Sequence, residues 1–119
     1  MTVFLSVGAL GNNMVQYTEG YGHQPLADST LIDDSLTWTI YGGSLAHINW
    51  SIKLGWDHIW SGAWAGVSVM SLGLQIMVND SNHFGWVKLS VDSELGTLTV
   101  HDYAYQPTPG EPILAGVHP

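Results

Sequence analysis

The chain has 119 residues, of which 45% are apolar, and its ten acidic and two basic residues give a net charge of -8. This length predicts one domain, residues 1–119, and the apolar content excludes a disordered chain. Lysine and arginine are too few to neutralise phosphates, which excludes nucleic acids and anionic membrane surfaces as partners. Because cysteine is absent, disulfides, thiolate metal sites and a cysteine nucleophile are excluded as well.

Residues 1–13 predict an N-terminal strand followed by a tether. The strand begins at Met1, and Val3, Leu5 and Val7 alternate with residues of a second face, while the rest of the range is rich in glycine and asparagine. A terminal strand of this kind can complete its own sheet or the sheet of a neighbouring subunit. We therefore take Met1, Val3, Leu5 and Val7 as a candidate assembly strand, with pairing inside the subunit as the alternative.

The middle of the chain predicts further strands. Apolar and polar residues alternate over 36–41 and again over 46–54, and the glycines between them predict a hairpin. The uncharged stretch 59–79 is long enough to span a membrane, but the alternation over 67–78 is that of a strand. No membrane span is therefore expected.

Three tryptophans lie four residues apart, at positions 56, 60 and 64. Helical spacing would place them on one side, but three nearby glycines favour an irregular aromatic loop or a single helical turn. Tryptophan rings stack on sugars, so this segment is a candidate carbohydrate platform; the alternative is packing in the core or at a subunit interface. The candidate sugar-binding residues are Trp56, Asp57, His58, Trp60 and Trp64.

The C-terminal third predicts two strands joined by a short turn. Val87, Leu89 and Val91 alternate with polar residues, and Leu98 and Val100 restart the pattern after the turn. With the strands upstream, this predicts an all-β, single-domain antiparallel sandwich of jelly-roll-like form with one Gly/Trp-rich irregular segment.

The same region also resembles a known class. It runs Gly-Trp-Val-x-Leu from Gly85, then Leu-Thr-Val-His-Asp-Tyr-Ala-Tyr from Leu98, then Pro-Gly-x-Pro-Ile-x-Ala-Gly from Pro109. Over about residues 84–116 this order resembles the C-terminal end of secreted bacterial proteins of the PEP-CTERM (exosortase-sorted) class. Gln106 departs from that pattern, where an acidic residue is usual. The resemblance implies export and a β-rich domain and names no activity.

Motifs for metal ions and covalent modification are sparse. Asp57-His58 and His101-Asp102 are the best metal-ligand pairs, but neither has a third ligand at metal-site spacing, so no metal site is expected. Calcium ligation by Asp33-Asp34 or the polar turn 79–82 is a weaker alternative to ordinary turn capping, and no cofactor is expected. Asn49 and Asn79 begin formal glycosylation sequons.

The sequence contains no nucleophile elbow, P-loop or dinucleotide fingerprint, which favours a protein that is not an enzyme. The leading hypothesis is a secreted structural β-protein, extracellular or at the cell surface, that self-assembles into a filament or matrix by strand addition between its own copies. The low proportion of charged residues, 10%, fits buried subunit faces. The alternative is an extracellular, lectin-like module that binds polysaccharide through surface tryptophans.

Overall fold

The structure is a computed structural model of the 119-residue chain. The residues whose backbone it describes are 2–7, 13–17, 23–40, 43–50, 58–61, 64, 69–92 and 97–119. Side chains are described in 13–17, 23–40, 64, 69–91 and 97–119.

The described residues form β-strands joined by turns and contain no helix. None of them forms a helix long and apolar enough to cross a membrane. The predicted all-β class is confirmed. The strands are β1 (Thr2–Val7), β2 (Met14–Tyr17), β3 (Leu31–Ile32), β4 (Thr37–Thr39), β5 (Gly43–Trp50), β6 (His58–Ser61), β7 (Met70–Val78), β8 (Ser81–Asp92), β9 (Thr97–Tyr105) and β10 (Ile113–Leu114).

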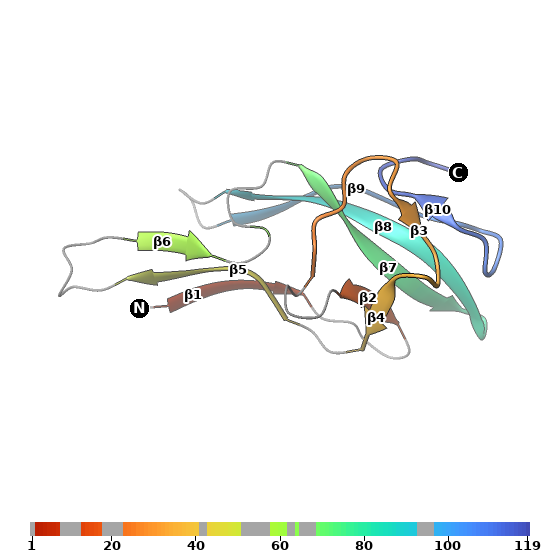
Figure 1. The fold of residues 1–119 in the computed structure, drawn as a ribbon, viewed down its shortest axis with the longest axis horizontal. Helices are drawn as coiled ribbons and strands as arrows, with labels where there is room; N and C mark the ends of the chain where they lie inside the picture. Colours follow the sequence, from red (N-terminus) through yellow and green to blue (C-terminus); the bar gives the residue numbers. More distant parts are fainter. Residues whose placement is uncertain are drawn as a thin grey trace.

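The strands belong to three antiparallel sheets. The largest has five strands in the order β4-β2-β7-β8-β9, the second has three in the order β1-β5-β6, and β10 pairs with β3 in the smallest. In Figure 1 the five-stranded and two-stranded sheets lie together on the right, while β1, β5 and β6 extend to the left. Each of these sheets, as far as its strands are described, is open and has two outer strands. The finer expectation of a jelly-roll-like sandwich stays a prediction.

The connection between β7 and β8 consists of two residues. Val78 pairs with Ser81, and the intervening Asn79 and Asp80 have φ angles of 49° and 63°. Asparagine and aspartate tolerate this left-handed region, and two such residues in succession give the turn whose twist matches that of the flanking strands. The predicted turn at 79–82 is therefore confirmed, in a tighter form that leaves Ser81 and Asn82 within β8.

One face of the five-stranded sheet carries the first of two apolar clusters. Directly opposite residues of paired strands share a face, so Leu72, Val87 and Tyr103 lie on the same side of β7, β8 and β9. We call this side the tyrosine face. Trp64 is fully buried against it. Its buried cluster comprises Val15, Trp64, Leu72, Leu89 and Val91.

The opposite face is covered by the small sheet of β3 and β10. Ile32 and Ile113 form a register pair in that sheet and pack with Phe84 and Trp86 of β8. The backbone of the segment after β10 is tied to the loop before β3, because Ala115 N donates to Thr30 O at 2.9 Å. We call this side the tryptophan face.

Two expectations for the middle of the chain were wrong. β4 pairs with β2 whereas β5 pairs with β1 and β6, so the predicted hairpin of 36–41 with 46–54 does not form. The Gly-Gly pair predicts a turn between neighbouring segments. In the structure, however, β4 and β5 pair with the more distant strands β2 and β1. The segment predicted to be an irregular loop or a helical turn contains strand β6, which includes Trp60.

Candidate functional site

The outer strand β9 is the most exposed apolar element among the described side chains. It lies at the end of the five-stranded sheet, and among the described strands it pairs with β8 alone. On the tyrosine face, Val100, Tyr103 and Tyr105 are 56%, 71% and 45% exposed. A long edge strand with apolar side chains is a template for pairing with another chain. β9 is therefore the first candidate site.

The hydrogen-bond pattern shows which backbone groups of β9 point outward. Gln106 N donates to Phe84 O at 2.8 Å, so residue 106 belongs to a hydrogen-bonded pair with β8. Hydrogen-bonded and non-hydrogen-bonded pairs alternate in an antiparallel ladder. Ala104, opposite Trp86, is then also bonded inward, whereas Tyr103 and Tyr105 direct their N–H and C=O groups away from β8. A bulge interrupts this regular ladder between Lys88 and Leu89.

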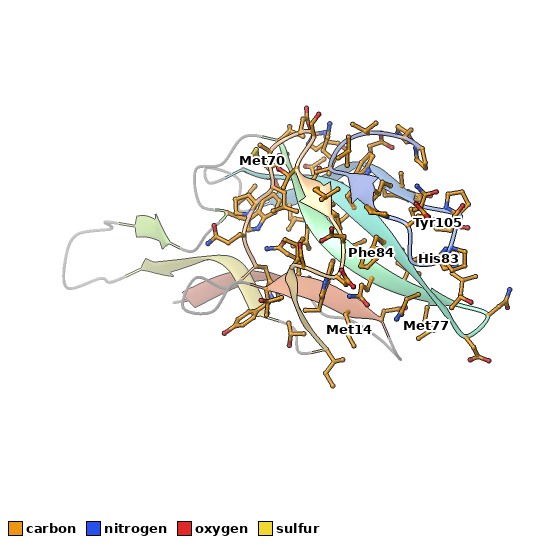
Figure 2. The ribbon with its side chains drawn as sticks, turned by 45° about the vertical axis from the view of Figure 1, so that its right-hand side comes forward. Met14, Met70, Met77, His83, Phe84 and Tyr105 are labelled. Atoms are coloured by element: carbon orange, nitrogen blue, oxygen red, sulfur yellow. The ribbon has the colours of Figure 1, made fainter. Side chains whose placement is uncertain are left out.

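The ring of Tyr105 is positioned by a buried histidine. The centroids of His83 and Tyr105 lie 5.6 Å apart with the rings edge to face, and both side chains are labelled at the right of Figure 2. His83 Nδ1 donates to Gln106 O at 2.7 Å, which fixes the histidine ring. Gly85, opposite Tyr105, leaves room here, since a Cβ at that position would lie 2.8 Å from Ala104 O.

Asp102 connects β9 to the C-terminal segment. His118 Nε2 donates to Asp102 Oδ2 at 2.7 Å, and the N–H of Tyr103 donates to Asp102 Oδ1 at 2.8 Å. The hydrogen bond from His118, followed by that from Tyr103, lowers the pKa of Asp102 below its ordinary value. The carboxylate of Asp102 thus accepts a hydrogen bond from the N–H of Tyr103, which is one of the outward N–H groups at the edge of β9.

The C-terminal segment lies over the tryptophan face. Trp86 Nε1 donates to Val117 O at 3.0 Å, and the ring of Trp86 meets that of His118 edge to face at 5.3 Å. Lys88 pairs with Asp28 at 3.4 Å. Gly116 has a φ of 73°, which favours glycine, and a side chain there would collide with Asp28. These contacts hold the segment beside β9.

The tryptophans with described side chains serve packing. Trp64 and Trp86 are fully buried, and Trp64 Nε1 donates to His23 O at 2.8 Å. Trp38 is half-buried and donates to Asp33 O at 3.1 Å. Trp64 therefore presents no free ring face to a sugar, contrary to its place in the predicted platform; burial in the core was the alternative.

The rest of that platform is only partly visible. His58 and Trp60 lie on β6, where Trp60 pairs with Ile48 of β5 and His58 pairs with Trp50. Trp56 and Asp57 lie outside the described residues. The structure therefore does not bring the five candidate sugar-binding residues together.

The candidate assembly strand is paired within its own subunit. Val3 of β1 lies opposite Ile48 of β5 and Leu5 lies opposite Ala46, with a register shift after Leu5. In this register, apolar residues of β1 lie opposite apolar residues of β5. Val7 pairs with Gly43, while Met1 lies outside the described residues. Strand β1 is the outer strand of this sheet, so β5 pairs with one of its edges and no described strand pairs with the other.

The histidines with described side chains are held by neighbours of the same subunit. His23 Nδ1 donates to Gln16 O at 2.8 Å, and His101 is hydrogen-bonded to Ser90 Oγ at 2.7 Å. Among the described residues, no three histidine, aspartate or glutamate side chains gather as ligands for a metal ion. Of the sequon residues, Asn79 is exposed in the β7–β8 turn and Asn49 lies on β5.

Comparison with known proteins gives no family assignment: no family model, curated protein or solved structure matches the chain. The fold and the site define an all-β protein with exposed sheet edges. Tyr103 and Tyr105 were not predicted as site residues from the sequence. The pattern that could have indicated them is a pair of tyrosines at alternate positions of a predicted strand, where small or polar residues are usual on an exposed face.

Proposed function

We propose that the chain is a structural β-protein that associates with copies of itself by strand addition at β1. The observation that supports this proposal is the place of β1 in the fold. It is the outer strand of a three-stranded sheet, and that sheet extends away from the five-stranded sheet in Figure 1. Among the described strands, β5 alone pairs with β1, which leaves the second edge of β1 for a strand of another subunit.

The composition of β1 suits pairing with a second copy. Its six residues, TVFLSV, carry no charge, although the chain as a whole has a net charge of -8. Two copies of an acidic chain repel each other, and an uncharged edge is where they can approach. Charged residues and prolines are the usual protection of a sheet edge, and β1 has neither.

In this proposal β1 stays paired with β5 and offers its second edge to a neighbouring sheet. Each added strand contributes a ladder of backbone hydrogen bonds without disulfides or metals. Export from the cell, which the resemblance of residues 84–116 implies, makes the assembly extracellular. Burial of Trp64 and Trp86 removes two tryptophans from the alternative, a polysaccharide-binding module.

The test is electron microscopy and sedimentation of the purified protein. The wild type is expected to form fibres or large particles. Deletion of residues 1–7 removes the edge that pairs with the neighbour and is expected to give folded single subunits. A wild type that stays a single subunit at every concentration would overturn the proposal.

A second variant covers the case in which the truncated chain does not fold. Phe4→Glu with Ser6→Glu leaves the strand in place and adds two like charges to its edge. Assembly should be lost while the circular dichroism spectrum is kept. Fibres that persist in a folded double variant would place the junction on another surface.

A further inference from the structure

We propose that β9 forms a second junction, in which it pairs antiparallel with β9 of a second copy about a two-fold axis at Ala104. The two five-stranded sheets then become one continuous sheet. The inference goes beyond the proposed function, because it uses a different sheet and stands whether or not β1 mediates assembly. It starts from the outward N–H and C=O groups of Tyr103 and Tyr105.

The axis follows from matching these groups. In an antiparallel self-pairing centred on Ala104, Tyr103 lies opposite Tyr105 of the second copy, and Tyr105 lies opposite Tyr103. Each of these two pairs is of the hydrogen-bonded type, so their outward groups exchange four hydrogen bonds once the N–H of Tyr103 in each copy is released from Asp102. Ala104 meets its own copy as a non-hydrogen-bonded pair, consistent with its inward-bonded backbone. A centre at Tyr105 would instead oppose Tyr103 and Pro107, which has no N–H.

The side chains favour the same centre. Tyr103 and Tyr105 share the tyrosine face, so each forms a cross-strand aromatic pair with the second copy and loses exposed surface. Ala104, small and on the tryptophan face, sits at the axis. The regular ladder on the Ala104 side of the bulge supplies the pairing, and Val100 lies beyond it.

Charge permits a second copy as the occupant and excludes one alternative register. Among the described β9 residues, Asp102 is the one carboxylate, and it is already paired with His118. A centre at Asp102 would oppose two carboxylates, whereas the centre at Ala104 places Asp102 opposite the amide residue Gln106. The contact is therefore free of like-charge pairs in a chain of net charge -8.

Disulfide trapping tests the axis directly, because the chain contains no cysteine of its own. Ala104→Cys is expected to form a cross-linked dimer with itself, since Cα atoms in a non-hydrogen-bonded pair lie about 4.5 Å apart, within disulfide range. Tyr103→Cys and Tyr105→Cys should each cross-link poorly alone and well when mixed. Leu114→Cys, 40% exposed on the small sheet, is the control and should stay uncross-linked.

A charge variant measures the same junction without cross-linking. Tyr103→Glu with Tyr105→Glu should weaken the dimer at least about tenfold in sedimentation, because two aromatic pairs are replaced by like charges. The matched control is Leu31→Glu with Leu114→Glu, which changes two exposed apolar residues on another sheet and should leave the dimer intact.

The outcomes separate this junction from the one at β1. Both cysteine experiments are repeated in the Phe4→Glu/Ser6→Glu background, where fibres are lost but the cross-link at Ala104 should remain. Absence of cross-linking at Ala104 in the folded protein overturns the inference. Stronger cross-linking by Tyr103→Cys alone than by Ala104→Cys overturns it as well, since the axis would then lie elsewhere.

Discussion

The N–H of Tyr103 donates a hydrogen bond to the side chain of the preceding residue, Asp102, at 2.8 Å. That N–H points away from β8 and is one of the groups that a second chain would use. Asp102 is held in place by His118 at 2.7 Å. The carboxylate therefore competes with an incoming strand for the edge of β9.

This relationship predicts that removing the carboxylate strengthens association. Asp102→Ala should shift the dimer equilibrium toward the dimer, because Tyr103 N–H then needs a new acceptor. Sedimentation equilibrium measures the shift. Glu111→Ala makes the same change of net charge away from the edge and should have a smaller effect. Equal effects of the two variants would show that the shift reflects net charge alone.

The pairing of Asp102 with His118 also predicts a pH dependence. The folded-state pKa of Asp102 is lowered, so its contribution to stability is present above the unfolded value of about 3.9 and is lost as pH falls through the folded value. His118→Ala should raise the pKa of Asp102 toward its ordinary value. Carboxyl NMR titration of both proteins measures this change, and an unchanged Asp102 titration would contradict the pairing.

The same pair should appear in unfolding experiments. The stability difference between the wild type and His118→Ala is expected at pH 5 and should shrink as the pH falls through the lowered folded-state pKa of Asp102, below which the carboxyl group is protonated in both proteins. Urea unfolding at several pH values gives the comparison. A difference that grows on acidification would have the wrong sign for this interaction.

Trp64 should be more important for stability than a binding residue would be. Trp64→Phe keeps an aromatic ring but leaves the buried His23 carbonyl without its donor, which costs about 1–3 kcal/mol of unfolding free energy. Urea unfolding measures the loss. Trp38→Phe is the matched control: its donor bonds to Asp33 O, but the side chain is half-buried, so water can replace the bond and the loss should be smaller.

Gly85 should not tolerate even the smallest side chain. A Cβ at this position would lie 2.8 Å from Ala104 O and 3.1 Å from Tyr105 Cβ, so β8 and β9 would have to move apart. Gly85→Ala is expected to cost about 1–3 kcal/mol, the range for overpacking. Gly110→Asn is the control, because its surroundings are open and asparagine tolerates a φ of 75°. A stable Gly85→Ala protein would place the two strands further apart than described.

Sequence patterns predicted most of the strands but not their partners. The alternation of apolar residues over 67–78 and 84–92 corresponds to β7 and β8, because a short turn joins them and the pairing is local. The position of β2 between β4 and β7 depends on contacts across about 60 residues, which no local pattern contains. For the same reason the hairpin of 36–41 with 46–54 was predicted wrongly.

The candidate site was predictable only in part. Periodicity marked Val3, Leu5 and Val7 as strand residues, and the structure pairs them with β5. It did not distinguish the tryptophans that pack from those that bind, because burial of Trp64 depends on the carbonyl of His23, 41 residues away in sequence. Likewise, the exposure of Tyr103 and Tyr105 follows from the position of β9 at the end of the sheet, which only the strand order reveals.

The central position of β7 and β8 also governs when the chain can fold during its synthesis. Their two-residue turn lets them pair as soon as both have been made, whereas β2 and β4, made much earlier, have no central strand to join until then. Ile32 likewise waits for Ile113. The partners of β1, β5 and β6 are all made early, but the five-stranded sheet is completed only after translation of its C-terminal strands. Completion of that sheet is therefore late relative to translation.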